Sequence, residues 1–164
     1  MNATEVRIQA QTTSGLVLDE VTSLKWVKEA IRNIIKIHSK AGKKVTDIIT
    51  AEADQAYTLT KELACIINVK DNSKTLVSPM LGFAVDSDNT ITFSKSGVYD
   101  VTYYSYPTPP QVSTDEIPLP LRFQDCIEFY LAFKMRARLF GQRDESAVAF
   151  YDQFQNSLLD ANLS

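Results

Sequence analysis

The chain has 164 residues, enough for one domain with its own packed core. Its content of 45% hydrophobic and 23% charged residues is typical of a globular protein and argues against disorder. The net charge of −3 argues against a protein that grips nucleic acid through a basic surface.

The sequence lacks a secretory signal at its start and an apolar run of the roughly 20 residues that a membrane-spanning helix needs. We therefore expect a protein that is made in a reducing cytoplasm and has no contact with a membrane. The two cysteines, Cys65 and Cys126, have no ligand spacing, and we expect both to be buried as free thiols.

Apolar residues at helical spacing predict a first helix over residues 23–42. Val27, Ile31 and Ile34 would share its buried face, with Ser23 as the N-cap and Gly42 as the stop. The preceding stretch 15–21 fits either a short strand or the first turns of this helix.

Residues 43–106 lose the helical period and alternate short β-branched or aromatic runs with turn sequences. The most apolar run, "LACIINVK" at 63–70, is expected to be a central strand. In the longest run Tyr99, Val101 and Tyr103 would share one face. The pattern predicts an antiparallel β-meander with one covered face.

Residues 107–120 form a proline-rich strap, because proline cannot donate a hydrogen bond to a sheet and favours extended backbone before it. Helical patterns follow over 121–140 and up to 162, and the joint at Gly141 predicts an antiparallel αα-hairpin over 121–162. The expected fold is α+β: a single domain over 1–164, with a helical bundle and an inserted β-meander.

The residues show no pattern typical of catalysis or metal binding. His38, the single histidine, is expected to be structural, and "DSDN" at 86–89 lacks the glycine and glutamate of a calcium loop. The adjacent acidic pairs point apart and favour caps or solvated loops. We expect no catalytic residue, no cofactor and no metal.

Two groups of residues are candidates for contact with other proteins. The basic run near 134–143 is either a solvated helix face or a surface for salt bridges between subunits, facing acidic groups such as Asp115, Glu116 or Asp144. The tyrosines at 103–106 are too many for one covered face, so some are expected at a partner. The candidate interface residues are Tyr104, Tyr106, Asp115, Glu116, Pro118, Arg136, Arg138 and Arg143.

The order of these elements resembles the head–tail adaptor proteins of tailed bacteriophages, also called connector or head-completion proteins. The resemblance lies in "VYDVTYYSYPTPP", then "DEIPLP" before an aromatic helix, then a short "GQRD" joint and a last helix, over roughly 23–160. The order and spacing of these motifs together carry the resemblance. The matching residues are Tyr103, Tyr106, Pro107, Asp115, Ile117, Pro118, Leu119, Pro120, Tyr130, Leu131, Gly141, Ala147, Tyr151 and Phe154.

The resemblance implies a structural virion protein, made in the host cytoplasm and located at the head–tail interface. Its copies would form a ring, usually of twelve, that docks below the portal, extends the DNA channel and offers a platform to the tail or stopper protein. The ring would enclose double-stranded DNA without sequence-specific binding, which suits an acidic chain. Some relatives carry a long C-terminal arm that inserts into the portal; this sequence ends at "LLDANLS", so its portal contact is expected to be short or made elsewhere.

Three alternatives stay open from the residues alone. The chain could be another neck protein, such as a stopper, although these tend to be rich in β-barrels. It could be a small hydrolase, although no nucleophile and base are paired in the sequence. It could also be a small β-rich module that binds a peptide or a sugar, with the strand from Tyr99 to Tyr106 as its platform.

Overall fold

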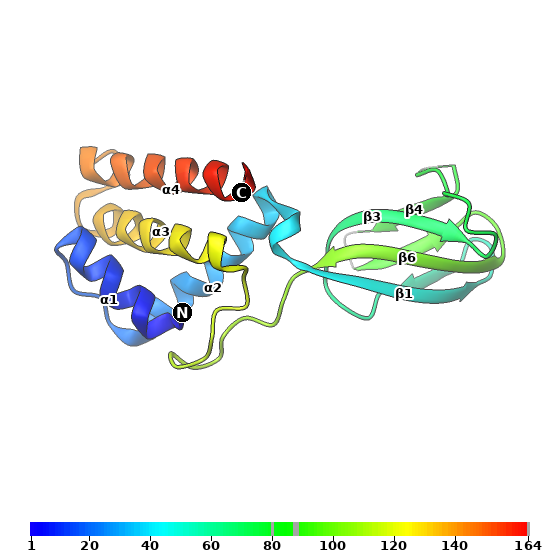
Figure 1. The fold of residues 1–164 in the computed structure, drawn as a ribbon, viewed down its shortest axis with the longest axis horizontal. Coiled ribbons are helices and arrows are strands. Elements are labelled where there is room, and N and C mark those ends of the chain that lie inside the picture. Colours follow the sequence, from blue (N-terminus) through cyan, green and yellow to red (C-terminus); the bar gives the residue numbers. More distant parts are fainter. Residues whose placement is uncertain (80, 87–88, 164) are drawn as a thin grey trace. The chain divides into compact units, whose positions relative to one another are not determined.

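The computed structural model describes residues 1–79, 81–86 and 89–163, with side chains up to residue 161. The chain is α+β, as predicted, and combines α-helices with two three-stranded antiparallel sheets (Figure 1). Its contacts divide it into two compact units. The helical unit comprises residues 1–41 and 108–164, and the strand unit comprises residues 42–107.

The helical unit has one more helix than expected. Its elements are α1 (Ala3–Ser14), α2 (Glu20–Ile37), a short 3-10 helix (Ser39–Ala41), α3 (Leu121–Phe140) and α4 (Glu145–Leu163). The helix expected over 23–42 is α2, which begins earlier because Asp19, and not Ser23, is its N-cap: Asp19 accepts a hydrogen bond from the Thr22 N–H. The regular helix stops at Ile37, before Gly42.

The additional helix α1 is held by its ends. Asn2 and Glu5 form a capping box, in which each side chain accepts a hydrogen bond from the other residue's backbone. Gly15 ends the helix in the left-handed conformation with φ of 69°, which glycine adopts without strain. Only small or widely spaced residues such as Val6 and Ala10 are buried, so the helix has no strong apolar stripe.

Helix α3 lies at the centre of the helical unit and packs against α1, α2 and α4 (Figure 1). Phe123, Ile127 and Leu131 are fully buried, and Phe154 and Leu158 of α4 pack in the same unit. Burying each such side chain contributes about 1.5–3 kcal/mol. The predicted αα-hairpin is confirmed, and Gly141 is the C-cap of α3.

The strand unit contains two sheets whose strands pair out of chain order. Its strands are β1 (Lys43–Ala51), β2 (Ala56–Thr58), β3 (Leu63–Asp71), β4 (Phe83–Asp86), β5 (Thr90–Phe93) and β6 (Gly97–Ser105). The sheet orders are β1-β6-β3 and β2-β5-β4, all antiparallel. The strand order therefore differs from a simple meander: β6 occupies the centre of its sheet, and β3, expected to be central, lies at an edge.

The core of the strand unit forms on the face that the alternation of β6 predicted. Tyr99, Val101 and Tyr103 are buried, and the rings of Phe93 and Tyr99 stack with centroids 4.0 Å apart. Buried Asp47 accepts a 3.0 Å hydrogen bond from the Tyr103 hydroxyl. Burial, the largest cause, raises the pKa of Tyr103. The phenol therefore stays protonated and donates to Asp47.

The cysteines differ in their surroundings. Cys126 is buried in α3, where burial raises the pKa of its thiol, as expected for a structural residue. Cys65 lies exposed on the edge strand β3, so the expectation of a buried thiol was wrong there. Within the described residues, no helix is both long and apolar enough to cross a membrane.

Candidate interaction site

Helices α2, α3 and α4 line a pocket of about 460 Å³ in the helical unit. Its wall combines aromatic rings with charged and amide side chains. The lining residues are Trp26, Glu29, Asn33, Tyr130, Phe133, Lys134, Ala137, Arg138, Gln142 and Tyr151. We call this the α3 pocket.

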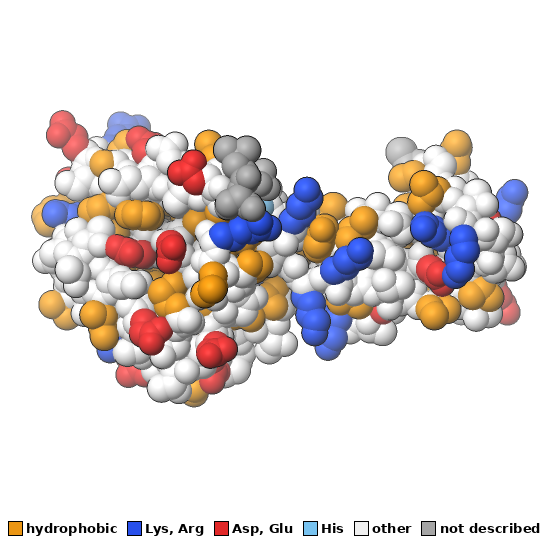
Figure 2. Space-filling view, viewed as in Figure 1, with side chains coloured by type: hydrophobic (Ala, Val, Ile, Leu, Met, Phe, Trp, Pro, Cys, Tyr) orange, Lys and Arg blue, Asp and Glu red, His pale blue; other side chains and the backbone are white. Residues whose placement is uncertain are grey.

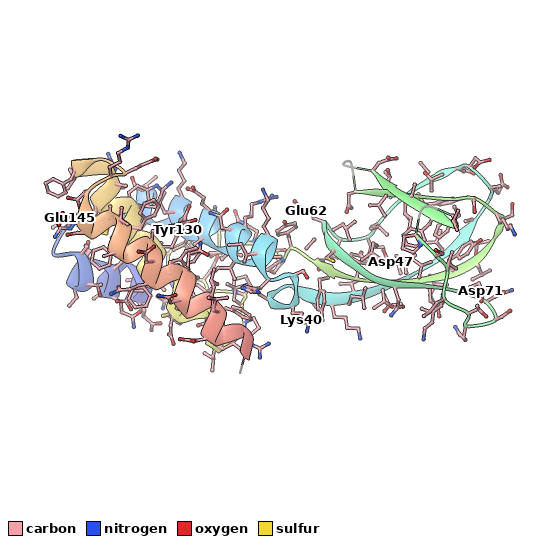
Figure 3. All side chains as sticks on the ribbon, turned by 90° about the horizontal axis from the view of Figure 1, so that it is seen from above. Lys40, Asp47, Glu62, Asp71, Tyr130 and Glu145 are labelled. Carbon is pink, nitrogen blue, oxygen red and sulfur yellow. The ribbon has the colours of Figure 1, made fainter. Side chains whose placement is uncertain are left out.

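A hydrogen-bond network forms the floor of the α3 pocket. The Tyr130 hydroxyl (labelled in Figure 3) donates a 2.7 Å hydrogen bond to Oε1 of Glu29 and accepts one of 3.0 Å from the Asn33 amide. Lys134 Nζ lies 2.9 Å from the same Glu29 oxygen. Glu29 and Asn33 come from α2, whereas Tyr130 and Lys134 come from α3, so the network joins two segments about 100 residues apart.

The network controls the charge of its members. Burial tends to raise the pKa of Glu29, but the hydrogen bonds from Tyr130 and Lys134 outweigh it and lower the pKa below its ordinary value. Burial, together with the negative charge of Glu29, raises the pKa of Tyr130. At neutral pH the carboxylate is therefore ionised and the phenol is a hydrogen-bond donor.

Aromatic rings surround the ammonium group of Lys134. Its Nζ lies 5.8 Å from the ring centroids of both Trp26 and Tyr130, within the range of a cation–π interaction. Phe133 and Tyr151 continue this wall, with ring centroids 5.1 Å apart. The aromatic wall limits the access of water to the lysine, although the lysine remains partly exposed.

The three arginines that the sequence singled out differ in exposure. Arg138 is exposed and lines the α3 pocket, near enough to Asp19 to help its N-cap hydrogen bonds lower that residue's pKa. Arg136 is half-buried, with its guanidinium 5.3 Å from the Phe140 ring, and its Nε has no hydrogen-bond partner among the described residues. Arg143 is exposed in the joint between α3 and α4.

Exposed apolar side chains lie at the end of the helical unit where α3 meets α4. Leu139, Phe140 and Val148 are all largely exposed, although they are adjacent to the joint between two well-packed helices. Figure 2 shows that hydrophobic side chains lie among acidic ones on the visible face of this unit. Apolar side chains beside charged ones are typical of surfaces that bind another protein.

The predicted acidic candidates have separate roles in the structure. Asp115 accepts hydrogen bonds from the backbone N–H groups of Gln111 and Val112, and these lower its pKa. Asp144 accepts one from the Ala147 N–H and so caps α4. Both carboxylates are committed to their own loops.

Glu116 is the candidate acid with an exposed side chain on an ordered backbone. Its backbone pairs with Asn2, and the next residue, Ile117, donates a 3.0 Å hydrogen bond to the Met1 carbonyl. Pro118, two residues on, is half-buried. This segment is therefore held against the start of α1.

The structure does not bring Glu116 together with the predicted arginines. Helix α1 runs between the two regions: Asn2 at its start pairs with Glu116, and Ser14 at its end donates a 3.5 Å hydrogen bond to Met135 Sδ. The 12 residues of α1 span about 18 Å, far more than an ion pair permits. Glu116 and the predicted arginines therefore lie at opposite ends of the helical unit.

The remaining candidates, Tyr104 and Tyr106, belong to the strand unit. Tyr104 lies on β6 and is half-buried, opposite in register to Lys44. Tyr106 is also half-buried, and its N–H donates a 2.9 Å hydrogen bond to the Glu62 carbonyl. Tyr99 and Tyr103 are buried, whereas Tyr104 and Tyr106 keep part of their surface exposed.

The strand unit has a larger groove of about 830 Å³ at the edges of β3 and β4. Residues such as Ile66, Leu76, Phe83 and Val85 line it, and its described lining carries no charged side chain. In the described part of the chain, no group of three or more His, Cys, Asp or Glu residues is placed to hold a metal ion.

Most residues that line the α3 pocket were not among the candidates predicted from the sequence. Glu29 and Asn33 are four residues apart on α2, and Tyr130 and Lys134 are four apart on α3. This spacing places each pair on one helix face and would have marked two polar stripes beside the apolar ones. That the stripes face each other is visible only in the folded chain.

No protein-family profile matches the sequence, and a search of curated proteins found no significant match.

Proposed function

We propose that this chain is a structural virion protein, the head–tail adaptor of a tailed bacteriophage. Its copies assemble into a ring below the portal, extend the DNA channel and provide the platform to which the tail or stopper protein attaches. The resemblance of the ordered motifs between residues 23 and 160 supports this function.

The observation that carries the proposal is the distance, within the helical unit, between Glu116 and the exposed arginines Arg138 and Arg143. Glu116 lies by the start of α1, whereas Arg138 and Arg143 lie at the far end of α3. Groups of opposite sign that cannot meet within one chain can meet between two copies placed head to tail. Such heterologous contacts close into rings when the rotation between copies closes.

The overall charge suits a conduit for DNA. A net charge of −3 per chain, repeated around a ring, disfavours tight binding to phosphates. DNA would then pass through the ring without being held.

Binding to a portal complex tests this function. The purified full-length chain is mixed with the portal of its own phage, and the mixture is separated by size-exclusion chromatography with light scattering. We expect the two to elute together at a mass corresponding to one adaptor per portal subunit. Separate elution at micromolar concentrations of both would overturn the proposal.

A further inference from the structure

The α3 pocket has an excess of positive charge. Its lining carries two cations, Lys134 and Arg138, and one anion, Glu29. Glu29 is paired with Lys134 at 2.9 Å, and Arg138, exposed in the pocket lining with the Asp19 carboxylate nearby, is the cation that a further carboxylate can reach. The complement of this pocket is one carboxylate, accompanied by apolar atoms that can contact Phe133 and Tyr151.

The chain itself offers such a carboxylate at its opposite end. Asp19, Asp115 and Asp144 all accept backbone hydrogen bonds within their own loops or caps. Glu20 accepts a hydrogen bond from the Ser113 hydroxyl. Glu116, in contrast, is exposed, and its carboxylate has no ion pair with another described residue.

The surroundings of Glu116 also fit the pocket. Val112 and Leu121 are exposed on either side of it in sequence, and Leu139 and Phe140 are exposed beside Arg138. The backbone of Glu116 is fixed by its pairing with Asn2, so little backbone entropy is lost when the side chain is bound.

We propose that Glu116 of one copy enters the α3 pocket of the next copy and pairs with Arg138 and Lys134. This inference rests on the proposed function and names the contact that joins neighbouring subunits of the ring. The site is complete only when the second copy supplies the carboxylate. The two halves of the contact lie at opposite ends of the helical unit. Each copy therefore supplies Glu116 to one neighbour and the α3 pocket to the other.

A charge swap tests the contact. The variants are Glu116→Lys, Arg138→Glu and the double variant, with Asp125→Lys as the matched control, because Asp125 is an exposed acid on the first turns of α3. Ring formation is measured by mass photometry at low and high salt, with and without portal. Circular dichroism confirms that each variant is folded, and Glu116→Gln serves as a milder change.

We expect each single reversal to lower the apparent association constant by about tenfold or more, because like charges across an interface repel. The double variant should recover to within about threefold of the wild type, and Asp125→Lys should change association less than about threefold, since it lies outside the contact. The loss in the single variants should depend on salt.

The outcomes separate this inference from the proposed function. Rings that form equally well with Glu116→Lys, or a double variant no better than the singles, would overturn the contact and leave the adaptor function standing. A wild-type chain that neither forms rings nor binds the portal would overturn both.

Discussion

Glu29 on α2 and Lys134 on α3 are joined by an ion pair of 2.9 Å, and Tyr130 donates a hydrogen bond to the same carboxylate oxygen. The side chains of the pair keep 40% and 27% of their accessible surface, so the ion pair alone stabilises the fold only weakly. Tyr130 is buried, and its hydroxyl on α3 bonds both Glu29 and Asn33 of α2. We therefore expect this hydroxyl to contribute more to the packing of α2 on α3 than the ion pair does.

Replacement of Tyr130 by Phe should therefore destabilise the helical unit. The change removes a donor to Glu29 and an acceptor for the Asn33 amide, with an expected cost of about 1–3 kcal/mol in the free energy of unfolding. Urea unfolding followed by circular dichroism measures it. Tyr151→Phe is the control, because Tyr151 is exposed; equal effects of both changes would contradict the role of the network.

The ionisation of Glu29 predicts a dependence of stability on pH. Its pKa in the folded chain lies below the ordinary value of 4.5, so the carboxylate stabilises the fold fully above pH 4.5, and this contribution is lost as the pH falls through the folded pKa. The free energy of unfolding of the wild type should exceed that of Glu29→Gln above pH 4.5, by roughly a few tenths of a kcal/mol for a partly exposed group. This difference in the free energy of unfolding should shrink below pH 4.5. A difference that grows on acidification would show that folding raises the pKa of Glu29 and does not lower it.

The contact of α4 with α3 depends on buried Phe154. Its ring meets Tyr130 with centroids 5.2 Å apart, and Phe154→Ala should cost about 3–5 kcal/mol through lost burial and the cavity left behind. Leu159→Ala, in the same helix but largely exposed, should cost less than about 1 kcal/mol. Chemical denaturation of both variants checks the contrast, and a large loss with Leu159→Ala would indicate that this face of α4 is covered.

Much of this architecture was predictable because the strongest periodic patterns are local. The apolar stripe of α2, the alternation of β6 and the Gly141 joint each follow from the spacing of neighbouring residues. Helix α1 was missed because its stability comes from the capping box and from α3, with few large apolar residues of its own. The place of β6 between β1 and β3 depends on pairings between distant residues, which no local pattern records.

In the candidate site, too, local features could be predicted from the sequence and long-range arrangements could not. Arg138, Glu116 and their charges were recognisable in the sequence, but their separation along α1 was not. The commitment of Asp115 and Asp144 to backbone hydrogen bonds also emerges only from the folded loops. The α3 pocket required the facing of two helices that are about 100 residues apart in the chain.

In the strand unit, Tyr103→Phe tests the buried network around Asp47 (labelled in Figure 3). The change removes the 3.0 Å hydrogen bond to Asp47 and the acceptor of the Lys61 N–H. We expect it to lower the free energy of unfolding of the strand unit by about 1–3 kcal/mol. Hydrogen exchange should show faster opening of β1 and β6. Tyr104→Phe, at the half-buried neighbouring position, is the control and should leave the exchange rates nearly unchanged; acceleration in the control alone would contradict the assignment.

The most direct test of the proposed adaptor function is negative-stain imaging of the purified chain with and without the portal on which the proposed ring would dock. A structural subunit with complementary ends should appear as rings with a central opening, coaxial with the portal. A chain that stays monomeric and leaves the portal bare at micromolar concentration would contradict the function proposed for it.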